Sequence, residues 1–133
     1  MGGSLVFMAS KNAFAPGEGF GAYSVTKAGL VQMMRIAAIE GGASGIRSNA
    51  LNPDAVFDNS QLWAGGIREE RAAAHGIEPE DLESFYAQRN ILHRNARGQD
   101  VAAAAEFLLG DVSSRTTGAV IPVDGGVVGG FPR

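Results

Sequence analysis

The chain has 133 residues, 45% of them apolar, which is enough for the core of at most one domain. Its 11 basic and 14 acidic residues give a net charge of −3 with no basic block, so no nucleic-acid partner is expected. The absence of cysteine excludes disulfides and thiolate metal sites and favours a cytoplasmic location. Because no apolar run approaches ~20 residues and the start lacks a basic leader segment, we expect no membrane association.

The first predicted elements are a strand and a long helix joined by a loop rich in Gly and Pro. The apolar run Ser4–Ala9 is typical of a strand buried on both faces. The segment Ala22–Glu40 is apolar nearly all round, which predicts a buried helix rather than an amphipathic one. Gly41 and Gly42 are expected to end this helix.

Three side chains with complementary chemistry lie where the strand gives way to the helix. Ser10 follows the strand, and Tyr23 and Lys27 are four residues apart, so both lie on one face of the helix. A phenol titrates near ~10, and a neighbouring ammonium favours its ionised form and so lowers that pKa. A tyrosine of this kind can exchange a proton with an alcohol or carbonyl oxygen. Each residue alone also has a structural explanation, since serines cap helices, tyrosines pack and lysines face water.

The middle of the chain contains a second strand and a long helical insertion. The second strand is predicted at Arg47–Leu51, followed by an Asn-Pro turn. The segment Phe57–His93 is longer than an ordinary connection and predicts two helices, Gln61–Ala74 and Pro79–Arg89. Pro79 and the acidic residues after it form a favourable first helical turn.

The last third predicts one more helix and one more strand. Asp100–Leu109 has an acidic start and an apolar face, and Ala119–Val123 is typical of a buried strand. The order strand, helix, strand, helical insertion, helix, strand predicts an α/β fold. The two histidines show no metal-ligand spacing, so no metal site is predicted.

Four short segments occur together in a recognisable order. They are Ser10 with the YSVTK motif at Tyr23–Lys27, the strand Ile46–Asn52 with Pro53 after it, Thr117–Gly118, and Val123–Gly126. In order and spacing they resemble the short-chain dehydrogenase/reductase family over almost the whole chain.

The resemblance implies the C-terminal half of a Rossmann-type, doubly wound parallel sheet with a helical substrate lid. The first strand resembles the family's fifth, so the Gly-rich half that receives the pyrophosphate is expected to be missing. Residues 1–133 then form a single partial domain. Residues 1–56 carry the catalytic strands and the nicotinamide loop, 57–93 the lid, and 94–133 the last helix, the last strand and a tail over the active site or at a subunit interface.

The resemblance also implies the roles of the site residues. Tyr23 is the acid/base, Lys27 lowers its pKa and binds the ribose hydroxyls, and Ser10 orients the substrate oxygen. The cofactor is NAD or NADP, with NAD favoured, and the loop Pro53, Asp54, Ala55 and Val56 meets the nicotinamide carboxamide. The family usually has glycine where Asp54 stands.

Asp58 stands where the family often has a threonine. In the family that threonine contacts the pyrophosphate, so this contact is in doubt for the present chain.

The substrate expectation comes from a closer resemblance. The segment REERAAAHGIEPEDLESFYAQR and the ending VDGGVVGGFPR resemble the dehydrogenase half of bifunctional rhamnulose-1-phosphate aldolase/alcohol (lactaldehyde) dehydrogenases, which implies a role in rhamnose catabolism. The implied reaction is hydride transfer between NAD(P) and a secondary alcohol or small, sugar-derived hydroxy-aldehyde. An arginine of the lid would bind a substrate phosphate. The lid side chains that could face substrate are Trp63, Arg68, Arg71, His75, Tyr86 and Arg89.

Partners and rival functions remain open at this stage. The Ala22–Glu40 helix implies a homo-oligomer, and the missing half implies that the chain alone is inactive. One alternative is a non-catalytic subunit that pairs with a full-length dehydrogenase. Another is a fragment that complements a separate N-terminal half. A plain sugar-binding module explains Tyr23 and Lys27 less well.

Overall fold

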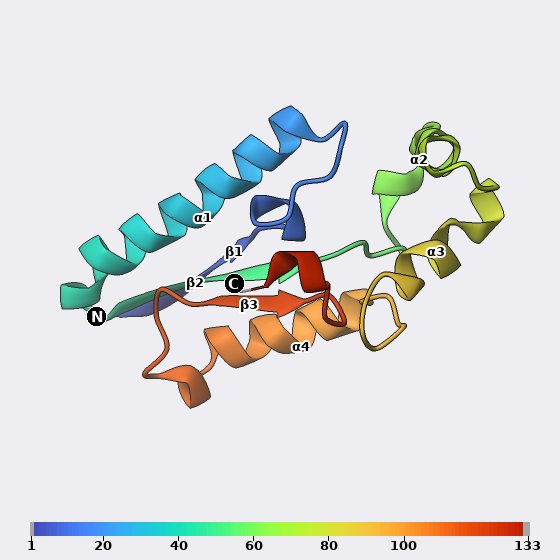
Figure 1. The fold of residues 1–133 in the computed structure, drawn as a ribbon. Helices are drawn as coiled ribbons and strands as arrows, with labels where there is room; N and C mark the ends of the chain where they lie inside the picture. Colours follow the sequence, from blue (N-terminus) through green and yellow to red (C-terminus); the bar gives the residue numbers. More distant parts are fainter. Residues whose placement is uncertain (1, 132–133) are drawn as a thin grey trace.

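A computed structural model describes residues 2–131 and contains a three-stranded parallel sheet. The strands are β1 (Gly3–Met8), β2 (Ile46–Pro53) and β3 (Val120–Val123), in the order β1-β2-β3 (Figure 1). Because β2 pairs with both neighbours in parallel, the carboxyl ends of all three strands lie at one edge of the sheet. The predicted α/β fold is confirmed.

Two helices cover the sheet and two stand beyond its carboxyl edge. Helix α1 (Gly21–Gly41) lies on one face and α4 (Gly98–Leu109) on the other. Helices α2 (Ile67–His75) and α3 (Leu82–Gln88) extend away from the sheet on the side where the strands end (Figure 1). Within the described part of the chain, no helix has the length and hydropathy needed to cross a bilayer.

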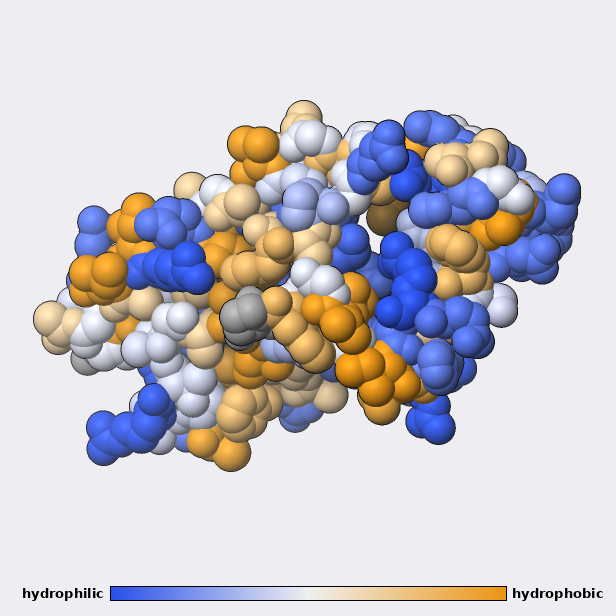
Figure 2. Space-filling model, viewed as in Figure 1, coloured by the Kyte–Doolittle hydropathy of each residue, from blue (hydrophilic) through white to orange (hydrophobic). Residues whose placement is uncertain are grey.

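Helix α1 buries one face only, so the expectation of burial all round was wrong for the single chain. Met34 is fully buried and Val31 is 3% exposed, and both pack against β2. On the opposite face Val25 is 71% and Ile39 is 80% exposed. Figure 2 shows apolar side chains on the outer surface of this helix. Because the helix is apolar nearly all round, the apolar residues on its outer side are left uncovered in a single copy of the chain.

Strand β1 is not buried on both faces, as its sequence predicted. Leu5 is 44% and Met8 is 43% exposed. The strand pairs with β2 alone among the described residues, so its outer edge lacks a neighbour whose side chains would cover these positions.

The strand and helix boundaries differ modestly from the predicted ones. Strand β2 begins one residue before Arg47 and ends two residues after Leu51.

The Arg47 side chain joins strand β2 to helix α4. Its guanidinium donates to the carbonyl oxygens of Leu108 and Gly110, at 2.8 and 2.9 Å. Both carbonyls lie at the negative end of α4, so Arg47 fastens that helix to the sheet.

The lid segment, residues 57–93, contains shorter helices than predicted. The expected helix Gln61–Ala74 is interrupted by Gly65 and Gly66, whose φ angles of 65° and 90° end a 3-10 turn before α2 begins. The expected helix Pro79–Arg89 divides into a 3-10 turn and α3.

The lid segment has a small core of its own. Ala72, Leu82 and Tyr86 form a buried cluster distinct from the one under α1. The His75 ring packs against Phe85 with 4.5 Å between ring centroids, and its Nε2 is buried without a hydrogen-bond partner in residues 2–131. The lid segment is therefore stabilised mainly by contacts within itself.

Each end of the lid segment is held to the rest of the protein by hydrogen bonds. Both carboxylate oxygens of Asp58 accept from the Gly98 N–H, at 3.1 and 3.2 Å, and so cap α4. At the other end the N–H groups of Ile91 and Leu92 each donate at 3.0 Å to the carbonyls of Gly126 and Gly125.

Two residues beside these bonds have unusual backbone angles. Asn59 and His93, with φ of 53° and 51°, are the two non-glycine residues of the described chain in the left-handed region. The chain therefore turns sharply at both ends of the lid segment.

Replacing Met34 by alanine should destabilise the protein by about 2–5 kcal/mol, because the fully buried side chain leaves a cavity between α1 and the sheet. The neighbouring Met33, which is 58% exposed, is the matched control, and Met33→Ala should change the stability by less than about 0.5 kcal/mol. Urea unfolding followed by circular dichroism measures both. Equal effects of the two substitutions would contradict the proposed packing of α1.

The His75 ring makes stability sensitive to acid. Burial, followed by the positive charges of Arg71 and Arg89, holds the pKa of His75 below its ordinary value of 6.5. As the pH falls through 6.5 the unfolded chain therefore takes up this proton before the folded chain does, and the free energy of unfolding decreases. The loss becomes constant once the pH is below the folded-state pKa.

His75→Phe removes this titration, so its free energy of unfolding should fall less between pH 7 and pH 5 than that of the parent. Urea titrations at the two pH values give the comparison. Parallel pH dependences in the two proteins would show that the ring is not protected as the packing implies.

Candidate active site

The predicted site residues gather at the carboxyl edge of the sheet. Met8 is paired with Leu51, so β1 ends two residues before β2 at the same edge, and the Ala9 N–H donates to the Leu51 carbonyl at 2.8 Å. The loop after β1 carries Ser10, and the loop after β2 begins at Pro53. Open parallel sheets bind ligands at such an edge.

Ser10 is a capping residue as well as a candidate for catalysis. Its side chain is almost buried, at 7% exposure, and its oxygen accepts the Asn12 N–H at 3.2 Å. This bond caps the 3-10 turn Lys11–Ala13. The hydroxyl proton remains available for donation to a substrate oxygen.

Tyr23 and Lys27 lie together in the first two turns of α1, as their spacing predicts. The Lys27 Nζ is 5.7 Å from the centroid of the Tyr23 ring and donates to the Met8 carbonyl at 2.9 Å. This bond fixes the ammonium at the end of β1 and leaves two of its three N–H groups free. Tyr23 is 39% exposed, and its hydroxyl makes no hydrogen bond with any residue from 2 to 131.

The loop after β2 presents backbone donors to the same region. The Asp54 N–H donates to the Val123 carbonyl at 3.3 Å, which holds the loop against the end of β3. Within residues 2–131 the N–H groups of Ala55 and Val56 have no acceptor. Two unpaired, neighbouring backbone N–H groups are suited to bind an oxygen of a ligand.

Four of the six lid side chains that could face a substrate instead hold the lid segment together, among them His75 through its contact with Phe85. The Trp63 Nε1 donates to the Val56 carbonyl at 2.8 Å. Arg68 forms an ion pair with Glu83 at 2.8 Å, and Tyr86 is 6% exposed in the lid core. These four residues are better explained by packing than by substrate binding.

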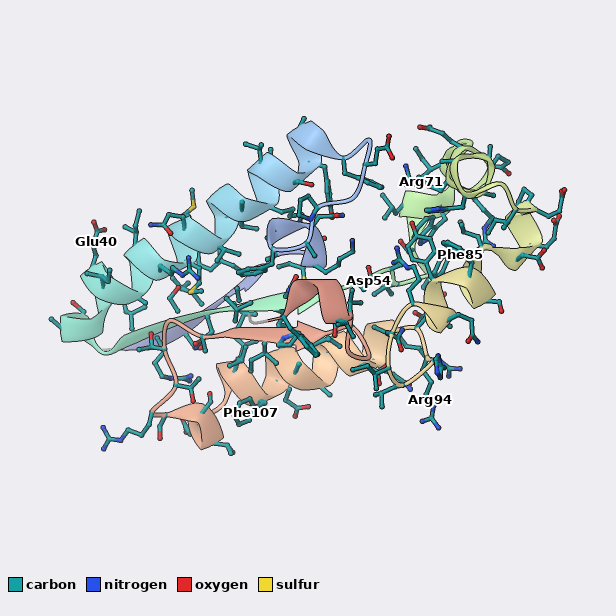
Figure 3. The ribbon with its side chains drawn as sticks, in the orientation of Figure 1. Glu40, Asp54, Arg71, Phe85, Arg94 and Phe107 are labelled. Atoms are coloured by element: carbon teal, nitrogen blue, oxygen red, sulfur yellow. The ribbon has the colours of Figure 1, made fainter. Side chains whose placement is uncertain are left out.

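The remaining two side chains, Arg71 and Arg89, contact the loops after β1 and β2. The Arg71 guanidinium lies over the Phe20 ring at 4.4 Å, and Arg89 forms an ion pair with Asp54 at 2.9 Å (Figure 3). Figure 2 shows the surface hollowed between the start of α1 and the α2–α3 pair, with hydrophilic side chains beside the hollow. Arg71 and Asp54 lie at this hollow.

Lys11 belongs to the same charged group and was not singled out from the sequence. Burial lowers the pKa of Lys11 from its usual 10.5; the nearby Asp54 charge opposes this, and the charges of Arg89 and Arg71 add to it. No pattern marks this residue, since a lysine after a strand normally faces water. Within the described chain, no three His, Cys, Asp or Glu side chains come together as a metal site.

Comparisons with known proteins agree with this geometry. A family model described as enoyl-(acyl carrier protein) reductase matches residues 1–128. The uncharacterized oxidoreductase YuxG of Bacillus subtilis (strain 168) is 46% identical over 132 residues, which are 99% of this chain and 19% of that protein. Cis-4-hydroxycyclohexanecarboxylate dehydrogenase of Sinomonas cyclohexanicum is 38% identical over 104 residues, 78% of this chain and 36% of its own length.

Solved structures of similar fold cover nearly the whole chain. Sorbitol-6-phosphate 2-dehydrogenase SrlD from Erwinia amylovora superposes with a TM-score of 0.87 at 26% identity, over 94% of this chain and 48% of that one. A short chain dehydrogenase family protein from Francisella tularensis gives a TM-score of 0.81 at 30% identity, over 92% and 49%. The chain thus spans less than half of these proteins, and it belongs to the short-chain dehydrogenase/reductase family of oxidoreductases, whose members bind NAD(P).

Proposed function

We propose that this chain supplies the catalytic half of an NAD(P)-dependent alcohol dehydrogenase, with NAD favoured as the cofactor. The observation that carries the proposal is the free, exposed hydroxyl of Tyr23 beside the Lys27 ammonium at the carboxyl edge of the sheet. The substrate is a secondary alcohol or a small, sugar-derived hydroxy-aldehyde. Without a nucleotide-binding half, the isolated chain should not turn over.

The groups at this edge fit the nicotinamide end of the cofactor. Two free N–H groups of Lys27 would bind the ribose hydroxyls, with Tyr23 beside them. The loop Pro53–Val56 would meet the carboxamide through the unpaired N–H groups of Ala55 and Val56. The nicotinamide, when bound, accepts the hydride from the alcohol carbon or returns it to the carbonyl.

The residues of this chain move the proton that accompanies the hydride. In oxidation the deprotonated oxygen of Tyr23 takes the proton from the substrate hydroxyl as the carbon–hydrogen bond breaks, and in reduction the Tyr23 phenol returns that proton. Ser10 donates its hydroxyl proton in a hydrogen bond to the same substrate oxygen and so fixes the distance to Tyr23. Lys27 holds its position through the Met8 carbonyl and places positive charge beside the phenol.

The substrate subgroup is proposed from the closer resemblance. YuxG shares 46% identity with this chain and is about five times its length, as expected for a protein that joins a dehydrogenase to a second catalytic part. We infer that the chain corresponds to the dehydrogenase half of a bifunctional rhamnulose-1-phosphate aldolase/alcohol dehydrogenase in rhamnose catabolism. Turnover of lactaldehyde by a longer form tests this assignment, and turnover of other secondary alcohols only would contradict it.

A second candidate follows from the open edge of β1. Leu5 and Met8 are exposed and the strand has no outer neighbour among residues 2–131, so a strand of another chain can pair there. The chain would then complement a separate nucleotide-binding half or join a full-length dehydrogenase without catalysing a reaction itself. Calorimetry separates these cases.

Calorimetric titration with NAD and NADP should show no binding to this chain and clear binding to a form extended upstream by a nucleotide-binding half. Binding after two separate halves are mixed would support complementation. Binding by the short chain alone would show that the missing half is not needed.

In the form that binds cofactor, Tyr23→Phe should lower turnover by about 10²–10⁴-fold, because the substrate oxygen loses its proton donor and acceptor. Tyr86→Phe is the matched control, since it removes the hydroxyl of the second tyrosine in the sequence and should leave the rate nearly unchanged. Steady-state kinetics with the alcohol measure both. Activity of Tyr23→Phe equal to that of the parent would exclude the proposed role.

Helix α1 is proposed as the contact between subunits of a homo-oligomer. Its outer face exposes four large apolar side chains, namely Val25, Met33, Ile36 and Ile39. Ile39→Glu places a charge at the most exposed of them and should produce monomers in sedimentation velocity. Val112→Glu, on an exposed side chain outside α1, is the control and should leave the oligomer intact. An unchanged oligomer in Ile39→Glu would locate the contact elsewhere.

A further inference from the structure

The hollow beside the candidate active site is bordered by more positive than negative charge. Lys11, Arg71 and Arg89 lie around a single carboxylate, that of Asp54. The four groups are close enough for Arg71, Arg89 and Asp54 all to act on the ionisation of Lys11. This local excess of positive charge contrasts with the net charge of −3 of the whole chain.

One of the three cations is already neutralised. Arg89 donates to Asp54 at 2.9 Å, and their side chains are 29% and 11% exposed. The Asp54 carboxylate is therefore largely withdrawn from water and committed to Arg89, with the Arg89 guanidinium also lying over Tyr86 at 3.9 Å.

The other two cations have no carboxylate partner among residues 2–131. Arg71 lies over the Phe20 ring, and its Nε is buried without an acceptor. Lys11 donates only to neutral oxygens, the Ala15 carbonyl at 3.0 Å and the Asn12 side chain at 3.4 Å. A buried donor without an acceptor and neighbouring like charges both raise the energy of the folded chain. An anion between Arg71 and Lys11 would relieve both costs.

These two cations adjoin the residues proposed for catalysis. Lys11 follows Ser10 directly. The Arg71 guanidinium lies over the Phe20 ring, and the centroid of that ring is 5.9 Å from the centroid of the Tyr23 ring. A small substrate whose oxygen reaches Ser10 and Tyr23 can therefore extend its other end toward Arg71 and Lys11. Arginine can bind both oxygens of a carboxylate or phosphate at once.

We propose that Arg71 and Lys11 form an anion subsite, so that the preferred substrate is a hydroxy compound, or its carbonyl counterpart, that carries a carboxylate or phosphate group. This inference rests on the proposed function, because it assigns the reacting end of the substrate to Ser10 and Tyr23. Within the class of alcohols and hydroxy-aldehydes proposed above, it favours the negatively charged members, so lactaldehyde, which is neutral, should be a weaker substrate than an anionic relative.

Binding to the 133-residue chain tests the subsite without any need for turnover. The probes are two pairs that differ in charge, 3-hydroxybutyrate against 3-hydroxybutyramide and glycerol 3-phosphate against glycerol. Calorimetry gives the affinities, and the fluorescence of Trp63, the single tryptophan, reports on the lid segment. At least one anion should bind about tenfold more tightly than its neutral partner, as expected for a charge-assisted hydrogen bond. The pair that shows the preference identifies the anion as a carboxylate or a phosphate.

Arg71→Gln and Lys11→Met should each remove most of this preference, about tenfold in affinity for the anion, and leave the affinity for the neutral partner unchanged. Arg35→Gln changes the net charge equally on the exposed surface of α1 and should keep the preference. Circular dichroism confirms that each variant is folded. Equal affinities within both pairs, or an equal loss in Arg35→Gln, would overturn the proposal.

Kinetics in the cofactor-binding form separate this inference from the proposed function. Arg71→Gln should raise KM for the anionic alcohol with little change in kcat, whereas Tyr23→Phe should lower kcat for charged and neutral alcohols alike. Loss of turnover in Tyr23→Phe with no charge preference in the parent would leave the proposed function standing and remove the subsite. A charge preference in the parent together with full activity in Tyr23→Phe would leave the anion subsite standing and remove the proposed function.

Discussion

The parallel pairing of β2 with β1 and β3 is the constraint on which the other features depend. Pro53 pairs with Val123, so β2 and β3 end together, and Met8 pairs with Leu51, so β1 ends two residues earlier at the same edge. The loops that follow them must therefore leave from the same edge, while α1 and α4 occupy the two faces. The side chains of chemical interest meet at this edge because both faces of the sheet are already covered.

Two separate apolar cores follow from this arrangement, and charged groups lie between them. The cluster under α1 holds the helix to the sheet, and the cluster around Leu82 holds the lid segment together. Between the two, the Asp54–Arg89 ion pair and the contact of Arg71 with Phe20 link the lid segment to the edge of the sheet. Apolar packing thus builds each part, and polar contacts set the distance between the parts.

The sequence predicted the order of the elements and the position of the catalytic candidates, because both depend on local patterns. Tyr23 and Lys27 needed only helical spacing to be placed on one face, and the structure brings their side chains together. The burial of α1 and β1 was overestimated, because an apolar pattern does not show which neighbours are present to cover it. The roles of the site residues remain predictions.

Contacts between distant parts of the chain could not be predicted in the same way. Lys11 matters because the fold brings it near Arg71 and Asp54, which are more than 40 positions away in sequence. Asp58 stands where the family's threonine would contact the pyrophosphate, and in the structure its carboxylate caps α4 at Gly98. Gly65 and Gly66 show the opposite case. The glycine pair is a local signal for a helix break, yet the prediction of one helix over Gln61–Ala74 ran across it.

The bonds at the two ends of the lid segment have a mechanical consequence. Asp58 is tied to Gly98 at one end, and Ile91 and Leu92 are tied to Gly125 and Gly126 at the other. If α2 and α3 move as a body while these bonds persist, the motion is a rotation about the line through the two anchor points, with Asn59 and His93 beside the axis. Such a rotation would change the width of the hollow without disturbing the sheet. It would also move Arg71 along an arc toward or away from Tyr23.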